Sequence, residues 1–352
     1  MFNFGERTCF VKPHTHKQLH SRSAFVVECL MYPLKFEKVL KEKIWGGREF
    51  EAMWGTPLPE GKNFGESWEV SAHQNGPSVV SEGPWAGQTL PEILRREGAK
   101  LVGRANFKRF GNTFPLLIKY LDIHDKLSIQ VHPDNAFSLE HEGEFGKSEC
   151  WYILRASPDA RLVLGMASSV TREQFALRSR QGHWEGLFNE IKVTAGDFLH
   201  IVPGTVHASL SGSVLLCEVQ QNSDTTYRIY DFDRLENGVK RPLHLDKALQ
   251  VIRFSEQPRV THAATRQRQA FEGAVVEPLV ADEQYIVDRL DINGTWKEPL
   301  EDRFKVLSIL EGGGAVVHAG KAWLLREGET WLLPANLEVV IQGELSLLRS
   351  TV

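Results

Sequence analysis

Metal-ligating residue types alternate with apolar residues in the short segment 127–132. The polar side chains occupy every second position, at Ser128, Gln130 and His132. Successive side chains of a β-strand point to opposite faces, so these three would share one face and an apolar set would form the other. An unpaired buried polar group costs ~1–3 kcal/mol. The polar face must therefore either contact a metal or substrate inside a barrel or be exposed to solvent. The alternation alone leaves both interpretations open.

Two further segments carry residues that could complete a metal site. Glu149 enters the β-prone run Cys150-Trp151-Tyr152, where an ionised carboxylate is costly unless a cation compensates it. His207 follows the turn Pro203-Gly204 in another alternating segment. Imidazole nitrogens with carboxylate and amide oxygens suit Zn²⁺, and Mn²⁺ or Fe²⁺ are also compatible. A lone histidine in a strand is usually structural, so only the combination indicates a metal site.

Two residues further along the chain could handle protons or negative charge. Glu218 follows the apolar residues 215–217, and burial in such a strand would raise its pKa toward neutrality. A purely structural carboxylate is the alternative. Arg228 could hold an oxyanion or a phosphate. It could equally form an ordinary ion pair with Asp231 or Asp233.

Composition and turn residues predict a mainly β protein that positions these side chains. The chain has 352 residues, of which 29 are Gly and 16 are Pro, and short apolar runs begin near Leu34. Capping signals predict helical insertions that begin at Thr89 and near Thr171. A further helix is predicted over 245–254, where apolar residues recur on one helical face.

Charge and cysteine content restrict the class of protein. The formal net charge of −4 argues against nucleic acid as a partner, because phosphate backbones favour basic surfaces. No apolar run approaches the ~18 residues that a membrane span needs. The four cysteines form no CxxC motif, which is typical of reduced thiols in a cytoplasmic protein. They are Cys9, Cys29, Cys150 and Cys217.

The chain is predicted to divide into a tail, two domains and a linker. Residues 1–30 are polar and aperiodic and are expected to be dispensable, with histidines that bind no metal. The disordered extension is expected to cover residues 1–33. A metal-binding domain is expected over 34–255, a linker over 256–272 and a C-terminal domain over 273–352. A weak repeat of turn, apolar strand and proline, ending at Pro203 and again at Pro334, suggests duplicated barrels.

Six short segments together resemble the successive motifs of type I mannose-6-phosphate isomerases, most of all the shorter bacterial form. The segments are Ile44-Trp45-Gly46-Gly47, Gly65-Glu66-Ser67-Trp68-Glu69, Gln130-Val131-His132-Pro133, Gly146-Lys147-Ser148-Glu149, Gly204-Thr205-Val206-His207-Ala208 and Tyr227-Arg228-Ile229-Tyr230-Asp231. The likeness extends from about residue 34 to the C-terminus. It implies a tandem cupin, that is, two double-stranded β-helix barrels with helical insertions in the first.

The resemblance also implies roles for individual residues. One Zn²⁺ per chain would be bound in the first barrel by Gln130, His132, Glu149 and His207. Arg228, Glu218 and Lys147 would be the catalytic residues, with Glu218 favoured as the proton carrier. Lys119 and Ser128 are candidates for contacts with phosphate or sugar oxygens. The C-terminal barrel is expected to hold no metal.

The expected reaction is the reversible isomerisation of mannose 6-phosphate and fructose 6-phosphate through a cis-enediol(ate). A cupin isomerase of another hexose is the nearest alternative, and a non-catalytic sugar-binding cupin belongs to a different class. The partner would be a small sugar phosphate rather than a nucleic acid or a membrane. A monomer and a homodimer are both compatible with the sequence.

Overall fold

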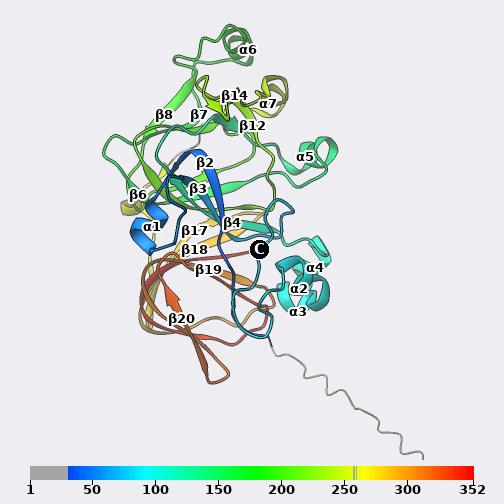
Figure 1. Cartoon of the computed structure of the whole chain (residues 1–352), viewed down its shortest axis with the longest axis vertical. Helices are drawn as coiled ribbons and strands as arrows, with labels where there is room; N and C mark the ends of the chain where they lie inside the picture. Colours follow the sequence, from blue (N-terminus) through cyan, green and yellow to red (C-terminus); the bar gives the residue numbers. More distant parts are fainter. Residues whose placement is uncertain (1–30, 257, 259) are drawn as a thin grey trace, which may run out of the picture. The chain divides into compact units, whose positions relative to one another are not determined.

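The structure, a computed structural model, describes residues 31–352 except 257 and 259 (Figure 1). The mainly β class predicted from the sequence is confirmed. The expected disorder of the N-terminal extension concerns residues that are almost all outside the described part, as are Cys9 and Cys29. The other two cysteines, Cys150 and Cys217, are buried free thiols. No helix among the described residues is long and apolar enough to cross a membrane.

Two sheets face each other across a shared apolar core. One contains, in order, β15 (Val260–Thr261), β9 (Phe198–Ile201), β6 (Glu149–Ala156), β11 (Val214–Gln221), β4 (Leu116–Ile123), β2 (Val39–Gly47) and β3 (Phe64–Val70). The other contains β12 (Tyr227–Tyr230), β5 (Ile129–Val131), β10 (His207–Ser211), β7 (Arg161–Met166) and β8 (Phe188–Lys192). Leu121 and Ile153 from the first sheet pack with Leu162 and Leu164 from the second. Their burial holds the sheets together.

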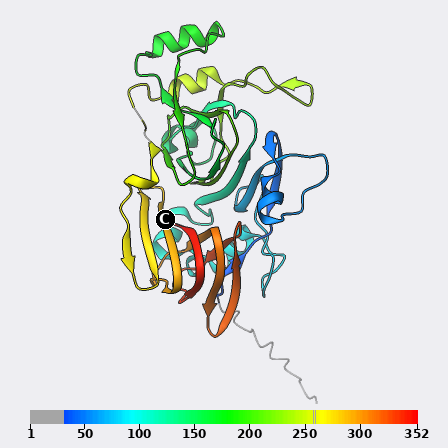
Figure 2. The same cartoon turned by 90° about the vertical axis from the view of Figure 1, so that its left-hand side faces the viewer.

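The C-terminal strands form a third sheet, drawn in yellow to red in Figure 2. Its order is β1 (Leu34–Lys35), β21 (Thr330–Leu333), β19 (Lys305–His318), β22 (Val340–Thr351), β18 (Ile286–Lys297), β17 (Ala274–Ala281) and β16 (Gln269–Phe271), with β20 (Lys321–Arg326) paired to β19. The first described strand therefore belongs to the C-terminal sheet, where Leu34 pairs with Leu332. The first part also contacts this sheet through a side chain: the Tyr120 hydroxyl of β4 donates to the Ile309 carbonyl of β19 at 3.1 Å.

Helices occupy the connections between strands of the first part. They are α1 (Glu49–Trp54), α2 (Leu90–Glu97), α3 (Ala99–Val102), α4 (Arg104–Phe110), α5 (Asn135–His141), α6 (Arg172–Arg180) and α7 (Leu245–Val251). Among them, α2, α6 and α7 match the sequence prediction. The predicted capping boxes are confirmed: Thr89 caps α2 and Thr171 caps α6. The helix expected over 245–254 is also confirmed, although it ends at Val251.

The segment expected to be a linker, 256–272, contains more structure than its polar sequence indicates. Its β15 pairs with β9 of the first part, whereas β16 pairs with β17 of the C-terminal sheet. A 3₁₀ turn, Ala263–Thr265, lies between them. The segment therefore connects the sheets through backbone pairing, and the exact domain boundary stays a prediction.

Candidate metal centre

Adjacent strands place His207, Gln130 and Arg228 in one row. His207 of β10 lies directly opposite Gln130 of β5, and Gln130 lies opposite Arg228 of β12. Side chains opposite each other in neighbouring strands share a face with Cβ atoms ~4.5–5.5 Å apart. Accordingly, the Gln130 amide nitrogen lies 3.2 Å from Nε2 of His207. The polar face predicted for segment 127–132 therefore points into the space between the sheets.

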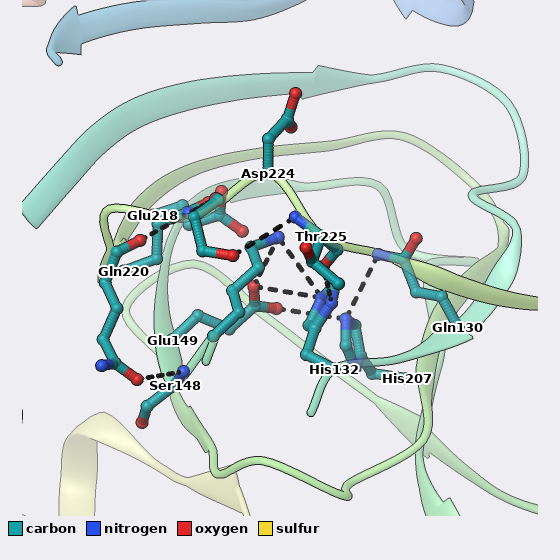
Figure 3. A network of polar contacts seen from close by, with 12 residues as sticks. Gln130, His132, Ser148, Glu149, His207, Glu218, Gln220, Asp224 and Thr225 are labelled. Carbon is teal, nitrogen blue, oxygen red and sulfur yellow. Dashed lines mark hydrogen bonds and ion pairs between the residues drawn. The ribbon is translucent and has the colours of Figure 1, made fainter. Parts of the chain in front are cut away.

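The facing sheet contributes Glu149, whose carboxylate meets both histidines (Figure 3). Its Oε1 lies 3.1 Å from Nε2 of His207, and its Oε2 lies 3.4 Å from Nε2 of His132. Strand alternation points Glu149 and Trp151 inward, while Cys150 lies on the opposite face of β6. All three candidate ligands are buried, and one ligand atom from each lies within 4.8 Å of the others.

Hydrogen bonds on the far side of each imidazole fix which nitrogen carries the proton. Nδ1 of His132 lies 2.9 Å from the Thr225 carbonyl oxygen, and Nδ1 of His207 lies 3.0 Å from the Thr205 carbonyl oxygen. A carbonyl oxygen can only accept, so Nδ1 is the donor in both rings, and in the neutral form of each ring Nε2 then keeps its lone pair. Burial, with the nearby Lys147 charge, holds the pKa of His132 well below its usual range, which keeps this ring neutral.

This arrangement fits a divalent metal. In the neutral tautomers both Nε2 lone pairs face the oxygens of Glu149, which has the Lys147 ammonium as its cationic partner. Acceptors that face one another in a buried space repel unless a cation lies between them. The Gln130 amide, turned by 180°, would add an oxygen as a further ligand. Two imidazole nitrogens, a carboxylate and an amide oxygen form a ligand set suited to Zn²⁺ and related ions.

Lys147 partly compensates the charge of Glu149. Its ammonium lies 3.0 Å from Oε2 of Glu149 and 3.3 Å from Nε2 of His132. Burial opposes ionisation of Glu149, yet the Lys147 charge holds the pKa of that carboxyl well below its usual range. In turn, although burial disfavours the ammonium, Glu149 raises the pKa of Lys147 above its ordinary value. Lys147 is therefore a hydrogen-bond donor in this site.

A cleft of about 300 Å³ opens above the three buried ligand candidates. Gln130 and Lys147 belong both to its wall and to the contacts of those ligands. Most of its lining is polar or charged: Lys43, Trp45, Glu66, Lys119, Leu121, Leu127, Ser128, Gln130, Lys147, Trp151, Glu218, Asp224, Thr226, Arg228 and Arg241. The volume is at the small end of the range for small-molecule sites.

Glu218 lies in the cleft wall on β11. It accepts a hydrogen bond from the Trp151 indole N–H at 2.8 Å, and its other oxygen lies 3.3 Å from the Lys119 ammonium. Burial, and next the charge of Glu149, raises the pKa of Glu218, although Lys119 opposes the shift. The raised pKa expected from the sequence therefore has the expected direction and cause.

All the remaining predicted site residues lie in this wall. Lys119 is buried beneath the Trp68 ring, with Nζ 5.0 Å from the ring centroid. Ser128 donates to the Gln130 amide oxygen at 3.4 Å. Arg228 donates to the Pro242 carbonyl at 3.1 Å, so the ion pair with Asp231 or Asp233 that the sequence allowed is not formed. The fold thus brings every predicted residue together, and their individual roles stay predictions.

Sequence reasoning missed several residues of the wall. Glu66 lies 2.9 Å from Lys43 and 3.9 Å from Lys119. Burial alone would raise the pKa of Glu66, but Lys119 and Lys43 bring it down to about 2. Glu66 lies in a segment used for the family resemblance, which was its only signal. Asp224 and Arg241 carried no signal, because both are polar loop residues.

Comparisons with known proteins agree with this geometry. Residues 33–154 match the family model described as phosphomannose isomerase type I, catalytic domain. A probable mannose-6-phosphate isomerase, GmuF, of Bacillus subtilis is 38% identical over 317 residues, which are 89% of this chain and 97% of that protein. The mannose-6-phosphate isomerase of Streptococcus mutans is 36% identical and covers 90% and 98% of the two chains.

Solved structures share the fold. The crystal structure of the mannose 6-phosphate isomerase from Bacillus subtilis superposes with a TM-score of 0.82 at 36% identity, covering 91% of this chain and 99% of that one. A phosphomannose isomerase mutant from Salmonella typhimurium has a TM-score of 0.70 at 16% identity, which bears on the fold alone. The predicted mainly β tandem cupin architecture is therefore confirmed.

Proposed function

This chain belongs to the type I mannose-6-phosphate isomerase family, and from that premise we propose that its cleft interconverts mannose 6-phosphate and fructose 6-phosphate. The observation that carries the proposal is the cluster of Glu149 with the Nε2 atoms of two imidazoles beside a charged cleft. A protein that only binds sugar would not need this full ligand set together with Arg228.

We assign the metal as Zn²⁺, held by His132, His207, Glu149 and the Gln130 amide oxygen. When bound, the ion supplies a Lewis acid for the sugar oxygens at C1 and C2. The chain's own residues maintain the site. Thr225 and Thr205 orient the rings through their carbonyl oxygens, which fixes the tautomer that can bind a metal.

Glu218 is the proposed proton carrier. The isomerisation of the open-chain sugar needs one base to take the proton from C2 and return it at C1, through a cis-enediol(ate). Lys147 is a poor base, because Glu149 raises its pKa and keeps it an ammonium. Glu218 has a pKa raised by burial, and the Trp151 N–H holds it in place. Lys147 is then left to donate to sugar oxygens.

Arg228 is the proposed partner of the negative charge that develops on the sugar oxygens. It lies next to Gln130 in the row that contains the ligands, and it lines the cleft. A preorganised guanidinium stabilises such a charge without reorganising during the reaction.

The decisive assay is turnover of mannose 6-phosphate by the purified protein with and without chelator. We expect turnover that chelator abolishes and that added Zn²⁺ restores. Free mannose and glucose 6-phosphate, tested under the same conditions, should turn over more slowly. Full activity in a metal-free protein, or preference for an unphosphorylated hexose, would overturn the proposal.

A further inference from the structure

Asp231 fixes the base of an exposed hairpin beside the cleft. The hairpin consists of β13 (Leu235–Glu236) and β14 (Val239–Lys240). Asp231 is buried and accepts a hydrogen bond at 2.9 Å from Arg234, which directly precedes the hairpin. It also accepts from Arg241, which directly follows the hairpin, through Nε at 2.8 Å and Nη2 at 2.6 Å. One carboxylate therefore holds both guanidiniums in place.

The two arginines nevertheless face different surroundings. Arg241 lines the cleft, whereas Arg234 is directed to Asp125, with Nη1 at 3.2 Å from its carboxylate. Because Asp231 serves both arginines, it does not fully neutralise Arg241. A bidentate contact along one edge of the guanidinium also leaves other N–H groups of Arg241 free to donate elsewhere.

Arg228 adds a cation without a carboxylate partner beside Arg241. Within the part of the chain that the structure describes, Arg228 forms no ion pair with a carboxylate, and its Nε has no hydrogen-bond partner. Burial, and next the charge of Arg241, lowers the pKa of Arg228 below its ordinary value. Two guanidiniums thus repel each other at one end of the cleft.

The lysines of the cleft wall differ from Arg228 and Arg241 in how their charges are compensated. Lys43 is paired with Glu66, Lys119 lies against Glu218, and Lys147 lies against Glu149. These lysines already have carboxylate partners, so they offer little net charge to a dianion. Arg241 shares Asp231 with Arg234, and Arg228 has no carboxylate partner among the described residues, so positive charge remains in excess at this arginine pair.

Strand order places Arg228 next to the row of metal ligands and Arg241 on its other side. The row runs from His207 through Gln130 to Arg228 on β12, the edge strand of its sheet. The backbone at His244 then pairs with the free edge of β12, donating to the Arg228 carbonyl at 2.7 Å. The segment that carries Arg241 therefore lies on the side of Arg228 away from Gln130.

We propose that Arg241, on the side of Arg228 away from Gln130, binds the phosphate group of the sugar substrate. The inference rests on the proposed function, because it assigns the orientation of a hexose phosphate in that cleft. The reacting carbons lie at one end of the sugar and the phosphate at the other. Planar guanidiniums match phosphate oxygens with paired N–H donors, and Asp231 keeps Arg241 ready for that contact.

Arg241→Met tests the proposal, with Arg234→Met as its matched control. Both variants remove one arginine from Asp231, but only the first removes a cleft residue. Arg241→Met should raise KM for mannose 6-phosphate about 10- to 100-fold while kcat stays within about threefold. Arg234→Met should change KM by less than about twofold. Arg241→Lys should restore part of the loss, because it keeps the charge but not the paired donors.

Inorganic phosphate provides a second measurement. It should inhibit the wild-type enzyme and Arg234→Met equally, and Arg241→Met at least about tenfold more weakly. An unchanged KM and unchanged phosphate inhibition in Arg241→Met would overturn the inference. Equal losses in Arg241→Met and Arg234→Met would do so too, because they would indicate only a loosened hairpin. If Arg241→Met does not fold, Arg241→Lys decides: wild-type KM and phosphate inhibition would overturn the inference.

The two proposals can fail separately. A wild-type enzyme that isomerises mannose 6-phosphate, with normal KM in Arg241→Met, refutes the phosphate site alone. A wild-type protein without turnover refutes the proposed function. Calorimetric binding of inorganic phosphate to the wild type and to both methionine variants then still tests Arg241, with equal affinities counting against it.

Discussion

Glu149 and Glu298 are both fully buried carboxylates, yet their surroundings are opposite. In the C-terminal sheet, Glu298 receives the Lys305 ammonium at 2.8 Å, the Arg349 guanidinium at 2.9 Å and the Trp296 indole N–H at 2.9 Å. In the facing sheets of the first part, Glu149 meets one ammonium and two imidazole lone pairs. Every neighbour of Glu298 is a donor, whereas Glu149 also faces acceptors.

The contrast distinguishes a structural carboxylate from a metal ligand. A buried charge that is fully paired with donors needs nothing further. A buried carboxylate that also faces acceptors needs a further cation between them. The weak internal repeat leads to the same contrast: His207 lies four residues after Pro203, and the exposed Glu338 lies four after Pro334. The absence of metal from the C-terminal barrel stays a prediction.

The largest expected effect comes from substituting the two carboxylates in the same way. Glu149→Gln should lose the metal and reduce turnover to the background rate, because an amide cannot supply the missing negative charge. Glu298→Gln should keep both metal and turnover. Metal content and turnover of the purified variants check this. Full metal in Glu149→Gln, or loss of metal in Glu298→Gln, would end the distinction between the two carboxylates.

Glu218→Gln should have the next largest effect. Removal of a general base lowers kcat by about 10²–10⁴-fold, while metal content and KM should change little. Exchange of the substrate C2 hydrogen with D₂O should slow in parallel, which identifies the step that is lost. Normal turnover in Glu218→Gln, combined with loss of exchange in Lys147→Met, would reverse the roles of these two residues.

Local sequence patterns were sufficient to predict many of the strands, helix starts and site residues of the first part. The alternation around Gln130 is a property of one strand, and the capping boxes at Thr89 and Thr171 are properties of helix starts. None of them depends on distant parts of the chain. The predicted site residues therefore lie on the expected faces, because β-strand geometry determines the face once the strand is recognised.

Contacts between distant segments could not be predicted in this way. The carbonyl that orients His132 belongs to Thr225, 93 residues away. Arg241 reaches the cleft because Asp231 closes a hairpin, and the pairing of Leu34 with Leu332 joins opposite ends of the described chain. Such contacts arise from tertiary packing, and a single sequence contains no period that reports it.

A smaller, graded effect is expected when pH is lowered. Burial raises the pKa of Glu218 above the usual value for glutamate, so its carboxylate form is lost while pH is still above that value. As pH falls through the raised pKa, kcat should fall about tenfold per unit. This acid limb should be absent from Glu218→Gln and unchanged in Glu298→Gln. Metal content measured at each pH separates the titration of Glu218 from loss of the ion.

The smallest effect on turnover is expected from Lys305→Met in the C-terminal sheet. Lys305 is buried and contacts Glu298 at 2.8 Å and Glu301 at 3.1 Å. Removal of one partner from a buried ion pair costs about 3–5 kcal/mol, because the remaining charge stays desolvated. The thermal midpoint should therefore fall clearly, although Arg349 still contacts Glu298. Lys297→Met, which breaks an exposed pair with Glu338, should cost at most about 1 kcal/mol.

Turnover per folded molecule should nevertheless stay at the wild-type level in Lys305→Met, measured well below its thermal midpoint. The reason is chemical: Glu298 has donors on every side, so a weakened network changes stability without changing the ligands of the metal centre. If Lys305→Met lost metal or turnover while still folded, the C-terminal sheet would position the ligands of the first part. The contrast between Glu149 and Glu298 would then describe two linked parts of one catalytic unit.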